Sequence, residues 1–369
     1  MAVQTAKPVQ VVAPCLRSIR ALALKRCCIS FCSQKNCTDG AVLPGGVIDV
    51  NGTLYGTTTS GGSNSNACQG IGCGTVFSLD PNTGAETVVY SFGGDTDGAW
   101  PYAGVIEGNG TLYGTTLGGG ANCQGSGGCG TVFALNPSSG KETVLYTFCG
   151  QKNCRDGSEP LAGLIDVKGT LYGTTRIGGA YPCASGYGCG TVFALDLKTG
   201  KEKVLHSFGS SGTDGMFPFA GLIDVKGTLY GTTSQGGTNA HKKRCYYGCG
   251  TVFSLDPETG VETVLHAFCG DQPNADSQQH CMDGAIPYTG VIDVKGTLYG
   301  TTLNAGAYGW GVLFALEPNT GAETVLHAFG RGTDGAGPWG PLTDATGTLY
   351  GVTAGGGAQG DGTVYKLRP

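Results

Sequence analysis

Seventeen cysteines are the residues of this chain with the plainest chemistry. Fourteen of them form close pairs, and Cys15, Cys27 and Cys28 are left over. The pairs are Cys32/Cys37, Cys68/Cys73, Cys123/Cys129, Cys149/Cys154, Cys183/Cys189, Cys245/Cys249 and Cys269/Cys281. Zinc would need four ligands, usually two such pairs together, but each pair lies a full repeat from the next. The best zinc candidate, His241 with Cys245 and Cys249, lacks a fourth ligand. We therefore expect local disulfides, no bound metal and an oxidising compartment.

Acidic residues recur in two sets. One set belongs to Asp-Gly pairs, and we expect its members to form Asx-type turns: Asp39, Asp97, Asp156, Asp214, Asp283 and Asp334. The other set precedes a short turn: Asp49, Glu107, Asp166, Asp224, Asp293 and Asp344. Two interpretations of the second set stay open, because such a carboxylate either caps the turn or lines an axial channel and holds a cation there.

Bulky side chains flank a proline soon after each Asp-Gly pair: Trp100, Tyr102, Leu161, Phe217, Phe219, Tyr288 and Trp339. They either pack between repeats or form an aromatic rim that stacks on sugars or other flat ligands. His206, His266 and His327 share one repeat position with Tyr90 and Tyr146, which indicates a structural role.

Two insertions interrupt the repeat most strongly, at 234–250 and 270–284. The first combines cations with aromatic rings, and Trp310 stands where other copies carry the second cysteine of a pair. Aromatic faces beside cations suit a sugar-like or anionic partner. The predicted ligand-binding residues are Lys242, Arg244, Tyr246, Tyr247 and Trp310, together with Trp100 and Trp339.

A repeat must position all of these residues. Gly-Thr-Leu-Tyr-Gly occurs six times, and its tyrosines, the first being Tyr55 and the last Tyr350, follow one another at intervals of 51 to 69 residues. Each copy contains four segments that we expect to be strands. A two-residue turn such as Asn51-Gly52 joins the first, a short β-rich run, to the second, Leu-Tyr-Gly-Thr-Thr. The third and fourth strands follow a Gly-rich loop. A period near 50 with several strands per copy is typical of a propeller or a solenoid.

The ends of the chain favour a closed ring. The last copy stops after its third strand, at 363–367, and residues 27–32 resemble a fourth strand. The sequence therefore predicts an all-β, six-bladed propeller of four-stranded blades, closed by an N-terminal strand that completes the last blade. Residues 1–26 form an atypical segment, which we expect to be processed or misassigned. The propeller covers 27–369, with blade cores at about 45–93, 103–149, 162–209, 220–269, 289–330 and 340–369 plus 27–32.

The repeat resembles a known family. The motifs Gly-Thr-Leu-Tyr-Gly-Thr-Thr and Gly-Thr-Val-Phe-Ala-Leu-Asp, with the Asp-Gly-x-x-Pro loop, are similar to the GloVer tandem repeat of bacterial "choice-of-anchor" proteins over about residues 27–369. The resemblance implies an exported or surface protein of unassigned activity. With the paired cysteines it predicts an extracellular or cell-surface location.

Composition and missing motifs narrow the function. Charged residues make up 13% of the chain and the net charge is −5, which argues against a nucleic-acid partner. No apolar run is long enough for a transmembrane helix, and no catalytic motif or cofactor fingerprint occurs. We expect a monomeric, non-enzymatic binding or interaction module, without a cofactor, whose partner is a glycan or a surface protein. The alternative is a carbohydrate-active hydrolase or lyase that uses acidic residues at the channel mouth.

Overall fold

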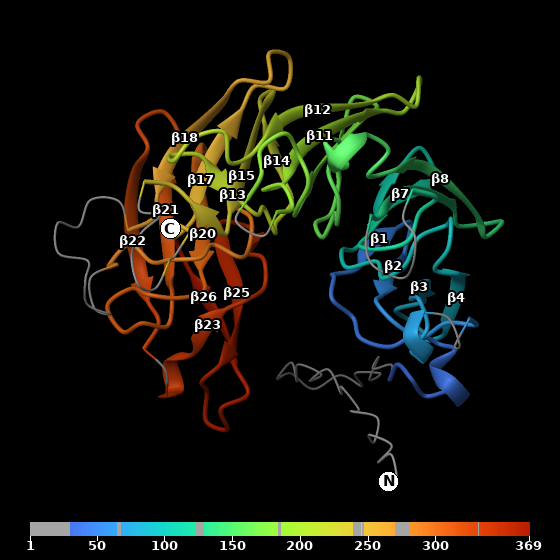
Figure 1. Ribbon diagram of the computed structural model, residues 1–369. Coiled ribbons are helices and arrows are strands. Elements are labelled where there is room, and N and C mark those ends of the chain that lie inside the picture. Colours follow the sequence, from blue (N-terminus) through green and yellow to red (C-terminus); the bar gives the residue numbers. More distant parts are fainter. Residues whose placement is uncertain are drawn as a thin grey trace, which may run out of the picture. The chain divides into compact units, whose positions relative to one another are not determined.

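The computed structural model describes residues 30–64, 68–122, 129–183, 186–238, 245, 247–269, 281–330 and 332–369. These residues form six four-stranded antiparallel sheets and no α-helix, which confirms the predicted all-β fold of a six-bladed β-propeller. Figure 1 shows the sheets following one another along the chain. They fall into two compact units, residues 1–147 with two blades and residues 148–369 with four.

The first unit contains blades one and two. Their strands pair in chain order. Blade one has β1 (Ile48–Val50), β2 (Thr53–Thr58), β3 (Thr75–Leu79) and β4 (Glu86–Ser91). Blade two has β5 (Ile106–Gly108), β6 (Thr111–Thr116), β7 (Thr131–Asn136) and β8 (Lys141–Thr147).

The second unit contains blades three to six (Figure 1). Blade three has β9 (Ile165–Val167), β10 (Thr170–Thr175), β11 (Thr191–Asp196) and β12 (Glu202–Ser207). Blade four has β14 (Ile223–Val225), β15 (Thr228–Thr233), β17 (Thr251–Leu255) and β18 (Glu262–Ala267), and a small ladder of β13 (Gly215–Met216) with β16 (Gln235–Gly236) stands beside it. Blade five has β19 (Ile292–Val294), β20 (Thr297–Thr302), β21 (Val312–Glu317) and β22 (Ala322–Ala328). Blade six has β23 (Ala336–Pro338), β24 (Thr343–Ala345), β25 (Thr348–Gly355) and β26 (Thr363–Leu367).

The turn between the first two strands of each blade explains one acidic set. In blade one, Asn51 and Gly52 both adopt positive φ, at 53° and 85°, as a two-residue hairpin turn requires. The Asp49 carboxylate accepts a hydrogen bond of 2.7 Å from the Gly52 amide. Glu107, Asp166, Asp224, Asp293 and Asp344 accept the corresponding bond in the other blades. The structure therefore uses all six carboxylates to cap hairpin turns.

The second glycine of the repeated Gly-Thr-Leu-Tyr-Gly motif makes room for a ring. In blade three, a Cβ on Gly173 would lie 2.7 Å from Cζ of Phe193, which is fully buried on the neighbouring strand. Phe193 in turn makes an edge-to-face contact with Phe148, which precedes blade three, at 5.0 Å between centroids. Equivalent contacts recur as Phe31–Phe77, Phe92–Phe133, Phe208–Phe253, Phe268–Phe314 and Phe329–Tyr365. In five of these contacts the phenylalanine is the residue directly after a fourth strand, and its partner lies on the third strand that follows along the chain.

The sixth sheet differs from the other five. β24, β25 and β26 match the first three strands of a blade, whereas β23 pairs with the far end of β25. Val364 of β26 is 61% exposed, while its counterpart Val192 in β11 is fully buried. The predicted closing strand, residues 27–32, lies outside the described residues up to Ile29, and Phe31 and Cys32 lie in a turn. Closure of the ring therefore stays a prediction.

Four 3₁₀-helical turns complete the described structure, at Lys35–Cys37, Cys68–Gly70, Lys152–Cys154 and Gly332–Asp334. In the described part of the chain, no helix has the length and apolar character needed to cross a membrane. The segment 1–26 lies outside the described residues.

Candidate functional site

Six of the seven predicted disulfides are present. They join Cys32–Cys37, Cys68–Cys73, Cys149–Cys154, Cys183–Cys189, Cys245–Cys249 and Cys269–Cys281. Cys129 is disulfide-bonded as well, and its predicted partner Cys123 lies outside the described residues. Three of the described bonds close loops after a second strand and two close loops after a fourth strand, while Cys32–Cys37 precedes the first strand of blade one.

These two kinds of loop meet on one side of each blade, which we term the loop face. The segment that follows the fourth strand donates a backbone hydrogen bond to the end of the loop after the second strand. The bonds run from Trp100 to Cys73, Phe217 to Cys189 and Ile286 to Cys249, each at 2.8 Å, and from Gly337 to Trp310 at 2.9 Å. Trp310 therefore takes the structural place of a second cysteine, as its repeat position predicts.

The predicted ligand-binding residues divide into three groups. Lys242, Arg244 and Tyr246 lie outside the described residues. Tyr247 and Trp310 are 37% and 39% exposed on the loop face of blades four and five. Their joint role in binding stays a prediction.

Trp100 and Trp339 lie on opposite sides of the repeat proline, because Trp100 precedes Pro101 and Trp339 follows Pro338, and their environments differ. Trp100 is half-buried and packs against the core of the first unit, beside residues such as Phe92 and Ala99. Packing between blades accounts for it. Trp339 is 53% exposed, so its indole is open to a ligand.

Trp339 ends a stack of rings along the second unit, which we term the aromatic row. Its indole stacks on Tyr288 at 4.9 Å between centroids, with 24° between the planes. Tyr288 stacks on Phe219 at 4.4 Å and 29°. The three residues follow Pro338, Pro287 and Pro218 in three successive inter-blade segments. Three of the aromatic residues that the sequence singles out therefore stack on one another, which is the packing interpretation, and their role in ligand binding stays a prediction.

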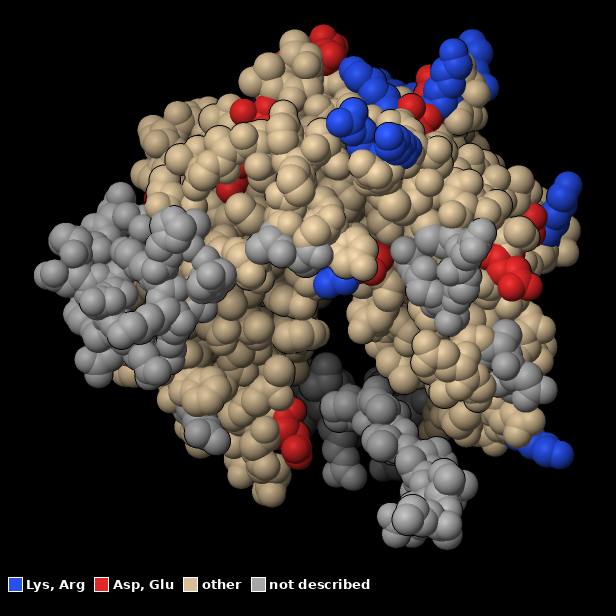
Figure 2. Space-filling model, viewed as in Figure 1, with Lys and Arg blue, Asp and Glu red and all other residues tan. Residues whose placement is uncertain are grey.

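An ion pair closes the other end of the aromatic row. The Arg176 guanidinium lies 5.8 Å from the Phe219 ring centroid, within cation–π range. The same guanidinium forms a two-pronged ion pair with the Glu159 carboxylate. The pair is neutral overall, and Figure 2 shows charged side chains scattered sparsely over the face in view.

The Asp-Gly residues form the predicted turns and also contact neighbouring side chains. Asp97 accepts hydrogen bonds from the Gly93 amide at 2.7 Å and from the Tyr90 hydroxyl at 2.9 Å. Asp214 accepts from the Ser210 amide at 2.9 Å and lies 3.3 Å from His206 Nε2. Each carboxylate thus accepts from an amide four residues before it, and not from the amide two residues on that an Asx turn uses. The Asp-Gly loops are turns, but the Asx geometry predicted for them is not what the structure shows at these two positions. His206 and Tyr90 hold the carboxylates, as expected of structural residues.

A glutamate of the following blade completes each arrangement, which we term an interblade cluster. The clusters are Tyr90/Asp97/Glu142, His206/Asp214/Glu262 and His266/Asp283/Glu323. Burial raises the pKa of each glutamate to about 7, and the nearby aspartate adds to the rise. One carboxylate oxygen of each glutamate is buried without a hydrogen-bond partner.

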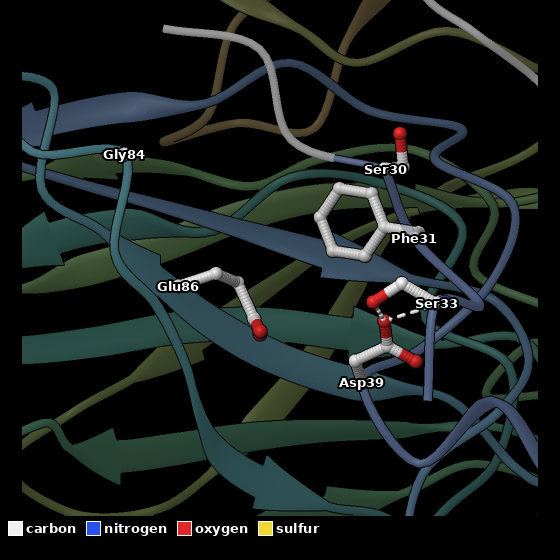
Figure 3. A pocket seen from close by; sticks show the side chains of 6 residues that line it. All are labelled: Ser30, Phe31, Ser33, Asp39, Gly84 and Glu86. Atoms are coloured by element: carbon white, nitrogen blue, oxygen red, sulfur yellow. Dashed lines mark hydrogen bonds between the residues drawn. The ribbon is translucent and has the colours of Figure 1, made fainter. Parts of the chain in front are cut away.

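A related pair lines a cavity in the first unit. Glu86 and Asp39 face a hollow of about 300 Å³, which Ser30, Phe31, Ser33 and Gly84 also line (Figure 3). The Asp39 carboxylate is held by the Ser33 hydroxyl at 2.7 Å and amide at 2.8 Å. Burial and the charge of Asp39 raise the Glu86 pKa to about 6. Glu86 occupies the same repeat position as Glu142, so this cavity is a variant of the interblade cluster.

Sequence reasoning missed two features. Tyr181 and Tyr187 are 42% and 67% exposed on the disulfide loop of blade three. Tyr308 is 67% exposed on the corresponding loop of blade five, which contains no cysteine, and no pattern in the repeat marks the three residues. The glutamate that begins each fourth strand does recur in the repeat, yet its neighbours come from the preceding blade and are distant in sequence.

Comparison with known proteins gives one family match. The model of the Gloeobacter/Verrucomicrobia repeat matches residues 22–245 and 242–369. Solved structures are similar only at a distance. A nidogen/laminin complex gives a TM-score of 0.44 at 11% identity, covering 85% of this chain and 94% of that one. TolB from Acinetobacter baumannii gives 0.42 at 12% identity, covering 83% and 61%. An oligogalacturonate lyase in complex with manganese gives 0.42 at 9% identity, covering 80% and 72%. No curated protein matches.

Proposed function

The chain belongs to the Gloeobacter/Verrucomicrobia repeat family, and from this premise we propose that it is a non-enzymatic binding module that takes a glycan on its loop face. The aromatic row is the observation that carries the proposal. Three stacked rings end in a Trp339 indole that is 53% exposed. An exposed indole offers a flat apolar face with little side-chain freedom to lose, which suits stacking against a sugar ring.

The charge at the aromatic row favours a neutral sugar. Arg176 and Glu159 neutralise each other, so the row carries no uncompensated charge at that end. A uronic acid or sulfated sugar would have to compete with Glu159 for the guanidinium. A neutral hexose chain needs only ring faces and hydroxyl partners.

The disulfides support an extracytoplasmic location. Local bonds at this density form and persist in an oxidising compartment. A glycan outside the cytoplasm would be within reach of such a protein.

The experiment is a glycan array followed by calorimetric titration of the tightest neutral oligosaccharide. We expect Trp339→Ala to weaken binding by about 10-fold or more, the equivalent of about 1.4 kcal/mol of lost stacking. The matched control is Tyr187→Ala, which removes another exposed ring, away from the aromatic row. Unchanged affinity in Trp339→Ala, with a weakened Tyr187→Ala, would place the site elsewhere.

The insertion residues form a second arm of the same test. The Trp310 carbonyl holds the Gly337 amide, two residues before Trp339, so Trp310 borders the aromatic row. We expect the triple variant Tyr246→Ala, Tyr247→Ala, Trp310→Ala to lose binding while its melting temperature changes little. Full affinity in this variant would confine the ligand to the aromatic row.

A reducing-sugar release assay separates the module from the hydrolase or lyase alternative. Binding without product supports the module. Turnover that disappears in Glu159→Gln, the carboxylate that the described contacts place beside the aromatic row, would favour the enzyme.

A further inference from the structure

The interblade cluster between blades three and four brings three metal-binding groups together. His206 comes from β12, Asp214 from the following loop and Glu262 from β18 of the next blade. Their ligand atoms all lie within 4.8 Å of one another. Within the described ranges, no other group of a histidine with two carboxylates comes so close. The other compact group, Cys245 with Cys249 and Cys269, has its sulfurs in disulfides.

The cluster holds two acidic side chains close together in a shielded place. Asp214 is 3% exposed, and one oxygen of Glu262 is buried without a hydrogen-bond partner. The Asp214 carboxylate accepts hydrogen bonds from the Ser210 amide at 2.9 Å and from the Ser210 hydroxyl at 2.8 Å, and His206 Nε2 lies 3.3 Å away. Two neighbouring carboxylates that are shielded from water are costly unless a cation compensates them.

The other interblade clusters supply an internal comparison. Between blades one and two, Tyr90 replaces the histidine and donates its hydroxyl proton to Asp97. Burial and this hydrogen bond raise the Tyr90 pKa, so the phenol stays protonated and is not a metal ligand. Between blades four and five, His266, Asp283 and Glu323 have the same residue types, but their ligand atoms do not meet within the same distance. The interblade cluster of blades one and two therefore forms without a set of metal ligands, whereas the cluster of blades three and four brings three possible ligands close together.

We propose that His206, Asp214 and Glu262 bind one divalent transition-metal ion, preferably Zn²⁺, which joins blade three to blade four. One imidazole nitrogen with two carboxylate oxygens suits Zn²⁺, whereas Ca²⁺ and Mg²⁺ prefer shells of oxygen alone. Three protein ligands leave a fourth position for water. The ion would neutralise the buried carboxylates and fix the distance between β12 and β18.

The test uses the full-length, untagged, oxidised protein, with any free thiols blocked by N-ethylmaleimide. After treatment with EDTA and dialysis, ZnCl₂ is titrated by calorimetry and bound metal is counted by mass spectrometry. We expect about one equivalent of Zn²⁺ and a rise in melting temperature of roughly 5 °C at saturation, because the ion binds only the folded chain. His206→Tyr should bind no Zn²⁺ yet stay folded, since it recreates the Tyr90 arrangement, and Glu262→Gln should weaken binding at least tenfold.

Two results would overturn the proposal. One is a wild-type protein that takes up no Zn²⁺ or binds Ca²⁺ in preference. The other is Zn²⁺ uptake that persists in both His206→Tyr and Glu262→Gln. His266→Tyr is the matched control, and it should keep the full equivalent. An equal loss in His266→Tyr would contradict the choice of His206 as ligand.

Discussion

Glu142 begins the fourth strand of blade two, where it lies beside Asp97 and Tyr90 of blade one. Its pKa is about 7 instead of the ordinary 4.5, so the folded state prefers the protonated acid. Such a group contributes stability below pH 4.5 and loses that contribution as the pH rises through 7. Glu142→Gln keeps a neutral side chain at every pH. We expect it to exceed the wild type by about 1 kcal/mol at pH 8 and to match it near pH 4.5.

Urea titrations at both pH values test this expectation, with the exposed Glu258→Gln as the control. A stability difference that is the same at pH 4.5 and pH 8 would contradict it. The cluster of blades one and two is the best choice, because Tyr90 stands there in place of a histidine.

Gly173 offers a second residue-scale prediction. A Cβ at this position would lie 2.7 Å from Phe193 and 2.9 Å from Leu164, both of them buried. Gly173→Ala should therefore lower the free energy of unfolding by about 1–3 kcal/mol. Gly212→Ala is the control, since nothing lies within 4 Å of its Cβ. A loss of the same size at Gly212 would show that backbone entropy and not the Phe193 ring sets the cost.

At the residue scale, the sequence predicted the local role of a side chain better than it predicted which side chains lie next to it in the fold. The Asp-Gly pattern placed Asp97 and Asp214 in turns, but it did not predict that each carboxylate accepts from the amide four residues earlier. The contact of Glu262 with Asp214 was not predicted either, because it joins two blades, and one repeat unit read by itself does not contain it. The exposed Tyr187 lies in a loop that the repeat leaves free to vary, so periodicity could not single it out.

At the scale of elements, each described disulfide closes a loop by joining two cysteines that are 4 to 12 residues apart in the sequence. The double variant Cys68→Ser, Cys73→Ser opens one such loop of few residues. We expect it to lose about 2 kcal/mol by the loop-entropy rule, since both sulfurs are buried and bonded. Urea titration measures the loss, and mass spectrometry of non-reduced peptides from exported protein confirms the Cys68–Cys73 link. Free thiols at both positions in the exported wild type would contradict the assignment.

The sequence predicted the strands well because their signals are local. Asn51-Gly52 fixed the first hairpin, and Gly-Thr-Leu-Tyr-Gly fixed the strand that follows it. The stacking of Phe219, Tyr288 and Trp339 could not be predicted from the sequence, because each ring comes from a different inter-blade segment. The spacing of those segments in space depends on the twist between blades, which no single repeat encodes.

At the scale of the whole molecule, β26 of blade six has no partner strand on its outer edge among the described residues. Its Val364 is 61% exposed. The sequence predicts that residues 27–32 supply this strand. Deleting residues 1–35 should therefore lower the melting temperature by more than 10 °C, roughly the effect of several kcal/mol in a protein of this size. Deleting residues 1–20 is the control, and equal melting of all three proteins would refute closure by this segment.

Six copies of one unit made the architecture predictable from the sequence, because only a propeller accounts for strands at this period with a split last copy. Function depends on the positions where one copy differs from the others, as at Trp310. Each such difference occurs once in the sequence, so no repeated pattern is available from which to predict its role.

The described disulfides span 4 to 12 residues. If the chain is exported, as proposed above, the partners of each bond would leave the secretion channel almost together, and an oxidant could seal each loop before the next blade emerges. The nearest thiol is then the correct one, and the chain has little need of an isomerase despite its seventeen cysteines.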